Sequence, residues 1–155
     1  MSEAKYKISR HYSEKCLNRL NELEDVILPK LTLDIESARE QGDLSENFDY
    51  HATKDEKAKL EGEQARLKEI LGSAEVVPIN YYKYKNLSTG DVYEVTLVDP
   101  VEADLFTEEA IIPISHSSGI AKQIDGHKTG DIINIFSKEG KNLYKVEILD
   151  FKVLD

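Results

Sequence analysis

Two long runs of charged, helix-patterned sequence make up the first half of this chain. In residues 12–41, apolar residues recur at steps of three or four, as on one face of an α-helix. They are Leu17, Leu20, Leu23, Ile27, Leu31, Ile35 and Ala38. Residues 47–74 repeat the pattern as a heptad seam through Leu60, Gln64, Leu67, Leu71 and Ala74. Two such helices with a tight connection predict an antiparallel hairpin of coiled-coil type, each arm about 40 Å long at 1.5 Å rise per residue.

Pro29 lies inside the first run. A proline within a helix removes one backbone hydrogen bond and costs roughly 3 kcal/mol. We therefore expect a kink or a short break in the first arm at this residue.

The connection between the arms, residues 42–50, is called the tip below. Gly42 suits a helix end, because glycine takes the left-handed conformation without a Cβ penalty. Asp43, Glu46 and Asp49 follow, with Asp43 and Glu46 three residues apart at the expected start of the second helix. A break between two helices that bury each other lies at the far end of the hairpin. The tip is therefore acidic, and we take it as the candidate site.

From Val76 onward the period of the pattern changes to that of strands. Strands are expected over residues 91–98, 110–114, 132–136 and 141–148, with one short helix over 118–125. Tyr81, Tyr82 and Tyr84 stand in what reads as a polar linker, where partial strand burial is the safer assumption. Helices followed by strands indicate an α+β chain. We place an N-terminal hairpin domain at residues 1–76 and a C-terminal sheet domain at 77–155.

Composition restricts the classes of function. Thirty acidic residues against twenty basic ones give a formal charge of −10, which argues against a protein that holds nucleic acid by its own phosphate contacts. The single cysteine, Cys16, excludes an internal disulfide and is expected to be buried. With neither a signal core nor a membrane-length apolar run, we expect a soluble, cytoplasmic protein with no membrane contact.

The tip and several C-terminal residues carry a family resemblance. The run 36–47 with Tyr50, His51, Ala52, Glu61 and Gly62 resembles the tip region of the bacterial Gre transcript-cleavage factors, closest to the GreA type. The C-terminal half follows the Gre pattern in order at residues 102–104, Ile114, Ser115, Ser118, Gly126, Gly130 and Asp131. The resemblance covers nearly the whole chain. It implies an N-terminal helical hairpin joined to an FKBP-like antiparallel β-sheet domain.

The resemblance also implies a mechanism. Gre factors bind bacterial RNA polymerase at its secondary channel and push the hairpin to the active centre. There the tip acids, here Asp43 and Glu46, help to hold a second Mg²⁺, and the polymerase cleaves the extruded 3′ end of backtracked RNA. The factor is expected to be a monomer and not itself an enzyme, with no cofactor of its own beyond the Mg²⁺ shared with the polymerase.

Other residues receive roles through the same resemblance. Asn47 and Tyr50 are expected to steady the tip or touch RNA, although Tyr50 could instead pack against the first helix beside Ala38. Ser117, Ser118, Gly119 and Ile120 occupy the place of a Ser-Pro-Ile loop that docks on the rim of the channel. Gly119 replaces the proline, so this loop should lose more entropy when it is ordered.

Alternatives remain open at this point. Asp43 and Glu46 could form a capping box, with Asp43 as N-cap of the second helix and Glu46 at its third position. A Gre-like protein could also occupy the channel without cleavage and so inhibit the polymerase, although the retained acid pair favours cleavage. An FKBP-like domain further suggests a peptidyl-prolyl isomerase, but fold does not carry function, and the C-terminal region contains no tryptophan for an aromatic-lined pocket.

Overall fold

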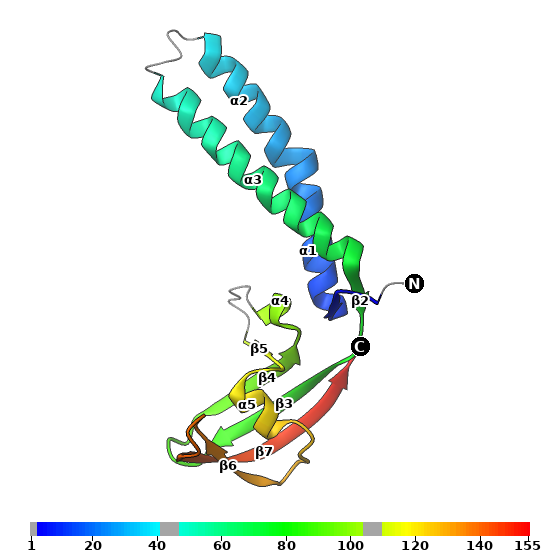
Figure 1. The fold of residues 1–155 in the computed structure, drawn as a ribbon, viewed down its shortest axis with the longest axis vertical. Coiled ribbons are helices and arrows are strands. Elements are labelled where there is room, and N and C mark those ends of the chain that lie inside the picture. The colour runs from blue at the N-terminus through cyan, green and yellow to red at the C-terminus, as the bar shows by residue number, and fades with distance from the viewer. Residues whose placement is uncertain (1–2, 41–46, 104–109) are drawn as a thin grey trace. The chain divides into compact units, whose positions relative to one another are not determined.

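A computed structural model describes residues 3–40, 47–103 and 110–155. The chain forms two compact units, one of Ser13–Ala74 and one of Met1–Tyr12 with Glu75–Asp155. The second unit therefore includes the start of the chain, which the sequence analysis had placed with the hairpin. Figure 1 labels the elements of both units.

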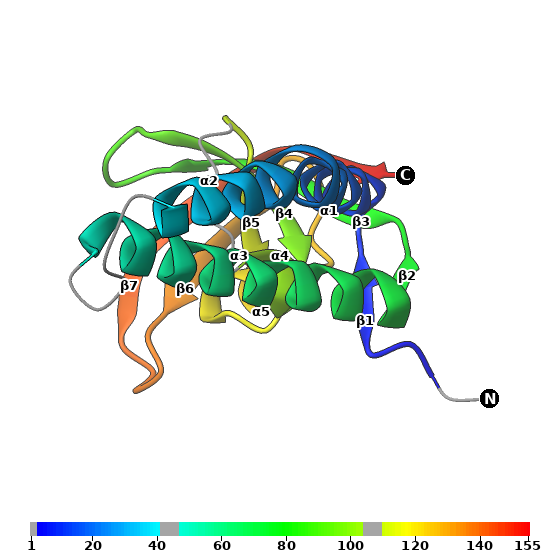
Figure 2. The ribbon, with the colours of Figure 1, turned by 90° about the horizontal axis from the view of Figure 1, so that it is seen from above.

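The first unit is a helical hairpin. Its first arm consists of α1 (Arg10–Glu22, the first turn of which belongs to the other unit), the π-helical turn η1 (Leu23–Ile27) and α2 (Leu28–Glu40). Its second arm is α3 (Phe48–Ser73), which lies beside α2 in both views (Figures 1 and 2). The predicted hairpin is thus present, and within the described residues neither arm is apolar enough to cross a membrane.

The buried side chains of the hairpin follow the predicted apolar faces in part. Leu20, Leu23, Leu31 and Ala38 are buried in the first arm. In the second arm, Leu67 of the predicted seam is buried together with Ile70, which that seam did not include. Cys16 is buried as predicted, whereas its neighbour Leu17 is half exposed, so the prediction that Leu17 belongs to the apolar face is wrong. Cys16 thus takes the place of Leu17 on the buried face of α1, four residues before Leu20.

Pro29 does not break the first arm. It is the second residue of α2, one residue after the π-helical turn, and at the end of that turn the amide of Leu28 donates to the carbonyl of Leu23. In a regular helix the proline ring would clash with the carbonyl four residues earlier, that of Asp25. The wider π turn contains Asp25, and insertion of such a turn is a known way to change the course of a helix. We attribute the π turn to Pro29.

The second unit is built on a five-stranded sheet in the order β5-β4-β3-β7-β6. The strands are β3 (Ile79–Asn86), β4 (Val92–Val98), β5 (Ile112–Ser115), β6 (Ile132–Phe136) and β7 (Asn142–Leu154). Helix α5 (Gly119–Ile124) contributes Ala121 and Ile124 to the core of the unit, which also contains Tyr82, Val95 and Ile148. The expected short helix and the four expected strands are all present.

Two features of the sheet differ from the prediction. β5 runs parallel to β4, so the sheet is mixed rather than antiparallel. The reason is the length of the connection: β4 ends at Val98 and β5 begins only at Ile112, after the short helix α4 (Pro100–Ala103), whereas an antiparallel neighbour can be joined by a two-residue turn. The region around Tyr81, Tyr82 and Tyr84 is the central strand β3 rather than a linker, and burial of the three tyrosines confirms the favoured alternative of strand burial.

The start of the chain is held to this unit by strand pairing and by the carboxylate of Glu102. Strand β1 (Tyr6–Ile8) pairs with β2 (Ala74–Val76), and the amide of Val77 donates to the carbonyl of Ile8 at 2.9 Å. Glu102, only 7% exposed, accepts from the Ser9 amide at 3.0 Å and from the Ser9 hydroxyl at 2.7 Å. The Ser9 hydroxyl in turn accepts from the amide of Tyr12 at 3.1 Å, so Glu102 orients the residue that caps α1.

Candidate functional site

The tip connects the end of α2 at Glu40 with the start of α3 at Phe48. The two predicted catalytic and metal-binding acids, Asp43 and Glu46, belong to this connection but lie outside the described residues. The structure therefore describes the ends of the two helices that carry the connection.

Asn47 ties these two helix ends together. Its side-chain oxygen accepts from the amide of Tyr50 at 3.0 Å, so Asn47 is the N-cap of α3. Its side-chain nitrogen donates to the carbonyl of Ala38, near the end of α2, at 2.8 Å. Asn47 thus holds the N-cap position of α3, while Asp43 and Glu46, the two residues of the alternative capping box, lie outside the described residues.

Tyr50 is the buried side chain of the first turn of α3. Its side chain is 8% exposed, which is what packing against the first arm predicts. The Arg39 guanidinium and the Lys54 ammonium lie 6.0 and 5.3 Å from the centre of its ring, within the range of cation–π attraction. A hydrogen bond from Arg39, together with the charge of Lys54, lowers the pKa of the Tyr50 hydroxyl. The His51 ring meets the Tyr50 ring edge-on at 5.3 Å.

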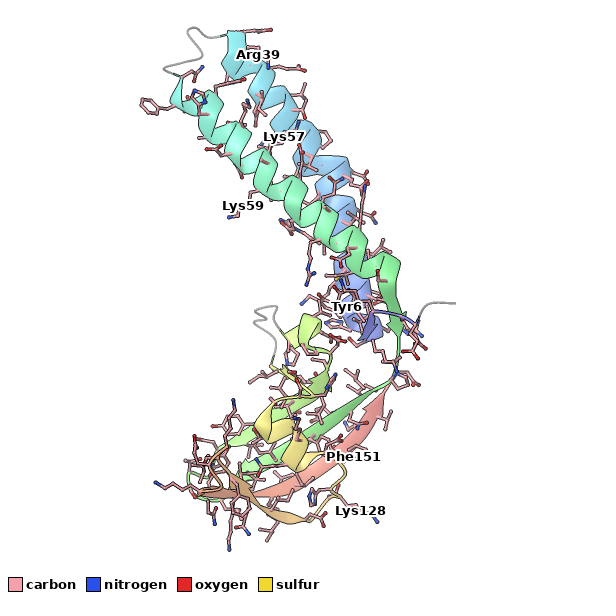
Figure 3. The ribbon with its side chains drawn as sticks, viewed as in Figure 1. Tyr6, Arg39, Lys57, Lys59, Lys128 and Phe151 are labelled. Atoms are coloured by element: carbon pink, nitrogen blue, oxygen red, sulfur yellow. The ribbon has the colours of Figure 1, made fainter. Side chains whose placement is uncertain are left out.

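A hollow of ≈ 310 Å³ lies between α2 and α3 below this aromatic pair. Its lining residues are Ile35, Arg39, Lys54, Lys57, Ala58 and Glu61. Lys57 pairs with Glu61 at 3.5 Å, whereas no described carboxylate pairs with Arg39 or Lys54. Figure 3 labels Arg39 and Lys57 on the two arms. The lining of this hollow therefore carries three basic side chains and one acidic side chain.

Phe48, the first residue of α3, is the residue that sequence reasoning passed over. Its side chain is 87% exposed, the highest value among the large apolar residues of the described chain. Only its position directly after the acids could have singled it out, since a single exposed apolar residue is otherwise ordinary.

Metal binding by the described residues alone is not supported. Nowhere in residues 3–40, 47–103 and 110–155 do three side chains of His, Cys, Asp or Glu gather closely enough to hold an ion.

The predicted docking residues form the entry to α5 rather than a loose loop. Ser118 is the N-cap of this helix, and its hydroxyl accepts from the amide of Ala121 at 3.2 Å. Ser117 is exposed and its hydroxyl lies 2.7 Å from that of Ser115. Gly119 is exposed at the first helical position, while Ile120 packs against the core. Of the four residues, Ser117 and Gly119 are therefore the ones fully open to a partner.

Comparison with protein-family models finds two adjoining matches. Residues 6–76 match the N-terminal domain of the GreA/GreB transcription elongation factors, and residues 70–152 match their C-terminal domain. The chain is 30% identical to the transcription elongation factor GreA of Thermotoga maritima, over 92% of this chain and 95% of the relative. It is also 30% identical to GreA of Rickettsia conorii, over 97% and 98%.

Among solved structures, the chain is similar to the GreA factor homolog 1 of Thermus thermophilus. The identity is 21%, the alignment covers 97% of this chain and 99% of that one, and the TM-score is 0.43. The GreA/GreB factor from Nitrosomonas europaea is matched at 22% identity over 57% of this chain and 78% of that one, with a TM-score of 0.35.

Proposed function

Because the chain belongs to the GreA/GreB family of transcription elongation factors, we propose that it binds bacterial RNA polymerase and stimulates the polymerase's own cleavage of backtracked RNA. In this proposal the hairpin enters the secondary channel, and its tip meets the extruded 3′ end of the RNA. The protein is then an activator of another enzyme, and it works in the cytoplasm as a monomer.

The hairpin is a long support for the tip. α3 contains 26 residues and is therefore about 39 Å long at 1.5 Å rise per residue. Buried apolar residues and the Asn47 side chain hold α2 and α3 together as far as the last turn of α2 and the first turn of α3. The two helix ends that support the connection therefore have little freedom to move.

The observation that carries the proposal is the position of the acid pair. Asp43 and Glu46 stand in the connection between α2 and α3, and the N-cap of α3 is supplied by Asn47. The start of that helix thus has a cap of its own from a residue outside the acid pair. Their retention at the end of the hairpin supports a chemical role over simple obstruction of the channel.

Asp43 and Glu46 would hold Mg²⁺ jointly with the polymerase. Bound there, the ion would activate water for phosphodiester hydrolysis and stabilise developing charge. The chain's own residues supply two oxygen ligands and the rigid support beneath them. Because two carboxylates bind Mg²⁺ weakly by themselves, the isolated protein should cleave no RNA.

We assign docking of the protein on the polymerase to the residues at the start of α5. Ser117 and Gly119 are exposed there, and Ile120 anchors the segment on the core. This surface would hold the factor at the rim of the channel while the hairpin reaches inward.

The test is cleavage in a stalled, backtracked polymerase complex with labelled RNA. Asp43→Asn and Glu46→Gln should each still compete for the channel but release at least about tenfold less 3′ fragment, since loss of a metal-orienting group typically costs 10- to 100-fold. Asp49→Asn is the matched control, because Asp49 is an exposed acid in the first turn of α3 and should behave as wild type.

Two outcomes would change the proposal. Cleavage by both acid variants at the wild-type rate would remove the chemical role of the pair. Binding by the wild-type protein without any cleavage would favour the second candidate, a channel binder that inhibits the polymerase.

A further inference from the structure

Strand β6 lies at one edge of the five-stranded sheet, with β7 on its inner side. An edge strand has one row of backbone amides and carbonyls without a strand partner, and such a row can pair with another chain. β6 contains neither a charged residue nor a proline, which are two of the devices that commonly protect an edge. In the described chain, a side chain of α5 covers part of this edge instead.

That side chain is Gln123, and it bonds to the backbone of Phe136. Helix α5 lies beside β6 (Figure 1). The Gln123 side-chain oxygen accepts from the amide of Phe136 at 2.8 Å, and the side-chain nitrogen donates to the carbonyl of Phe136 at 3.0 Å. The same nitrogen donates to the carbonyl of Gly119 at 3.0 Å, which fixes the orientation of the amide group. Gln123 thus bonds to Phe136 as the backbone of a neighbouring strand would.

The other outward backbone groups of β6 belong to Ile132 and Asn134. In an antiparallel strand, the amide and carbonyl of successive residues point alternately to the two edges. The amide of Ser137 donates to the carbonyl of Lys141 at 2.8 Å and so points inward, which agrees with an outward Phe136. The alternation then places Asn134 and Ile132 outward as well. Among the described residues, no strand pairs with β6 on this side.

Two copies of β6 match each other as antiparallel strands when Asn134 faces Asn134. Ile132 of each copy then faces Phe136 of the other, so every facing pair consists of residues with outward backbone groups. Each such pair exchanges two hydrogen bonds. A β-branched residue opposite an aromatic one is also a favourable cross-strand pair, and Ile132 and Phe136 are 61% and 45% exposed. The strand is therefore complementary to itself.

We propose that Gln123 closes the edge of β6 against a second copy of this chain and so keeps the protein monomeric. Phe136 takes part in both outer pairs of the self-paired register, and its amide and carbonyl are already bonded to Gln123. Only the central Asn134 pair remains open, and its hydrogen bonds are too few to offset the entropy lost on association. The inference concerns the sheet unit alone and does not depend on the proposed function.

The test is the molecular mass of Gln123→Ala, measured by sedimentation equilibrium over a range of protein concentrations. The wild-type protein should keep the mass of one chain, 17.6 kDa, throughout. Gln123→Ala should associate reversibly towards twice this mass, with an association constant raised at least about tenfold, because a net gain of one hydrogen bond alone corresponds to about that factor. Lys122→Ala is the matched control, since Lys122 is the exposed neighbour of Gln123 on α5, and it should behave as wild type.

A double variant tests where the two copies meet. Gln123→Ala combined with Asn134→Lys places two lysines directly opposite each other in the expected register, and like charges in that arrangement destabilise strand pairing. The double variant should therefore return to the mass of one chain. Asn134 is exposed, so its substitution should leave the core of the sheet unit intact.

Amide hydrogen exchange followed by NMR tests the Gln123 bonds in the wild-type protein itself. The amide of Phe136 should exchange more slowly than the outward amide of Asn134, and it should lose this protection in the monomeric double variant. Equal exchange of the two amides in the wild-type protein would overturn the inference. A Gln123→Ala variant that stays monomeric, or a double variant that still associates, would do the same. None of these results bears on cleavage by the polymerase, so failure of the inference and failure of the proposed function are distinguishable.

Discussion

Asn47 shows how much one side chain contributes at the end of the hairpin. A helix N-cap satisfies one of the backbone amides that the first turn leaves without a partner. Asn47 does this for α3 and also uses its amide group to reach the carbonyl of Ala38. The residue thus starts one helix and fastens it to the other, which neither a serine nor an aspartate in its place could do.

Asn47→Ala should lower the free energy of unfolding of the hairpin by about 2 kcal/mol, the sum of a lost cap and a lost hydrogen bond. The measurement is urea-induced unfolding followed by far-UV circular dichroism. Asn47→Asp is the matched control, because aspartate can cap α3 but cannot donate to Ala38, and it should lie between the two. Equal stability of Asn47→Ala and wild type would show that the tie contributes nothing.

The tyrosines of β3 predict a loss of stability at alkaline pH. Burial raises the pKa of Tyr84 from 10.0 to about 12, and burial with the hydrogen bond to Glu94 raises that of Tyr81 likewise to about 12. The folded state favours the neutral phenol, so this contribution is fully present below pH 10 and declines as the pH rises towards 12.

Tyr84→Phe should therefore lose less stability than wild type between pH 10 and pH 12. The urea midpoint measured across this range checks the expectation. Phe136→Leu, which changes an exposed ring of β6 and removes no titratable group, serves as the control and should keep the wild-type slope. Identical slopes for Tyr84→Phe and wild type would contradict the assignment.

At the scale of elements, α5 is prepared for the proline that this chain lacks. Gly119 is the first helical residue, the position at which proline is favoured because its amide has no partner within the helix. Ser118 before it has φ −67° and ψ 156°, the extended backbone that a following proline requires. Nothing lies within 4 Å of a Cβ built on Gly119.

Gly119→Pro should raise the free energy of unfolding by about 0.4–1 kcal/mol, because it restricts the unfolded chain without straining the folded one. Gly119→Ala keeps the amide and should give a smaller gain. Urea-induced unfolding followed by near-UV circular dichroism is the measurement. A decrease in stability for Gly119→Pro would mean that the entry to α5 differs from the one described.

At the scale of the whole molecule, the chain contains two separate cores. One lies within the hairpin unit Ser13–Ala74, and the other, around Tyr82, Val95 and Ile148, lies within the sheet unit. Chains with more than one compact unit commonly depart from two-state unfolding.

We therefore expect the calorimetric enthalpy of unfolding to exceed the van't Hoff enthalpy, which is the mark of more than one transition. Asn47→Ala should shift the transition of the hairpin, and Gly119→Pro should shift that of the sheet unit. A single transition that both substitutions shift together would show that the units unfold as one.

Much of this fold could be read from residue patterns, because the signals concerned are local. The steps of three and four that mark α3, and the alternation that marks β4 and β6, reflect which face of an element is buried. The short α5 carries its own N-cap in Ser118. The tip was located in the same way, from a break between two periodic segments.

What the sequence determined by itself was therefore the hairpin, its acidic connection and the order of helices before strands. Tertiary structure alone decided that the segment with Tyr81, Tyr82 and Tyr84 is the central strand, that β5 runs parallel to β4, and that Asn47 caps α3. It also joined Ser9 to Glu102 across most of the chain. Each of these depends on partners distant in sequence or on the choice among neighbouring residues that could cap a helix. Neither kind of interaction produces a periodic pattern in the sequence.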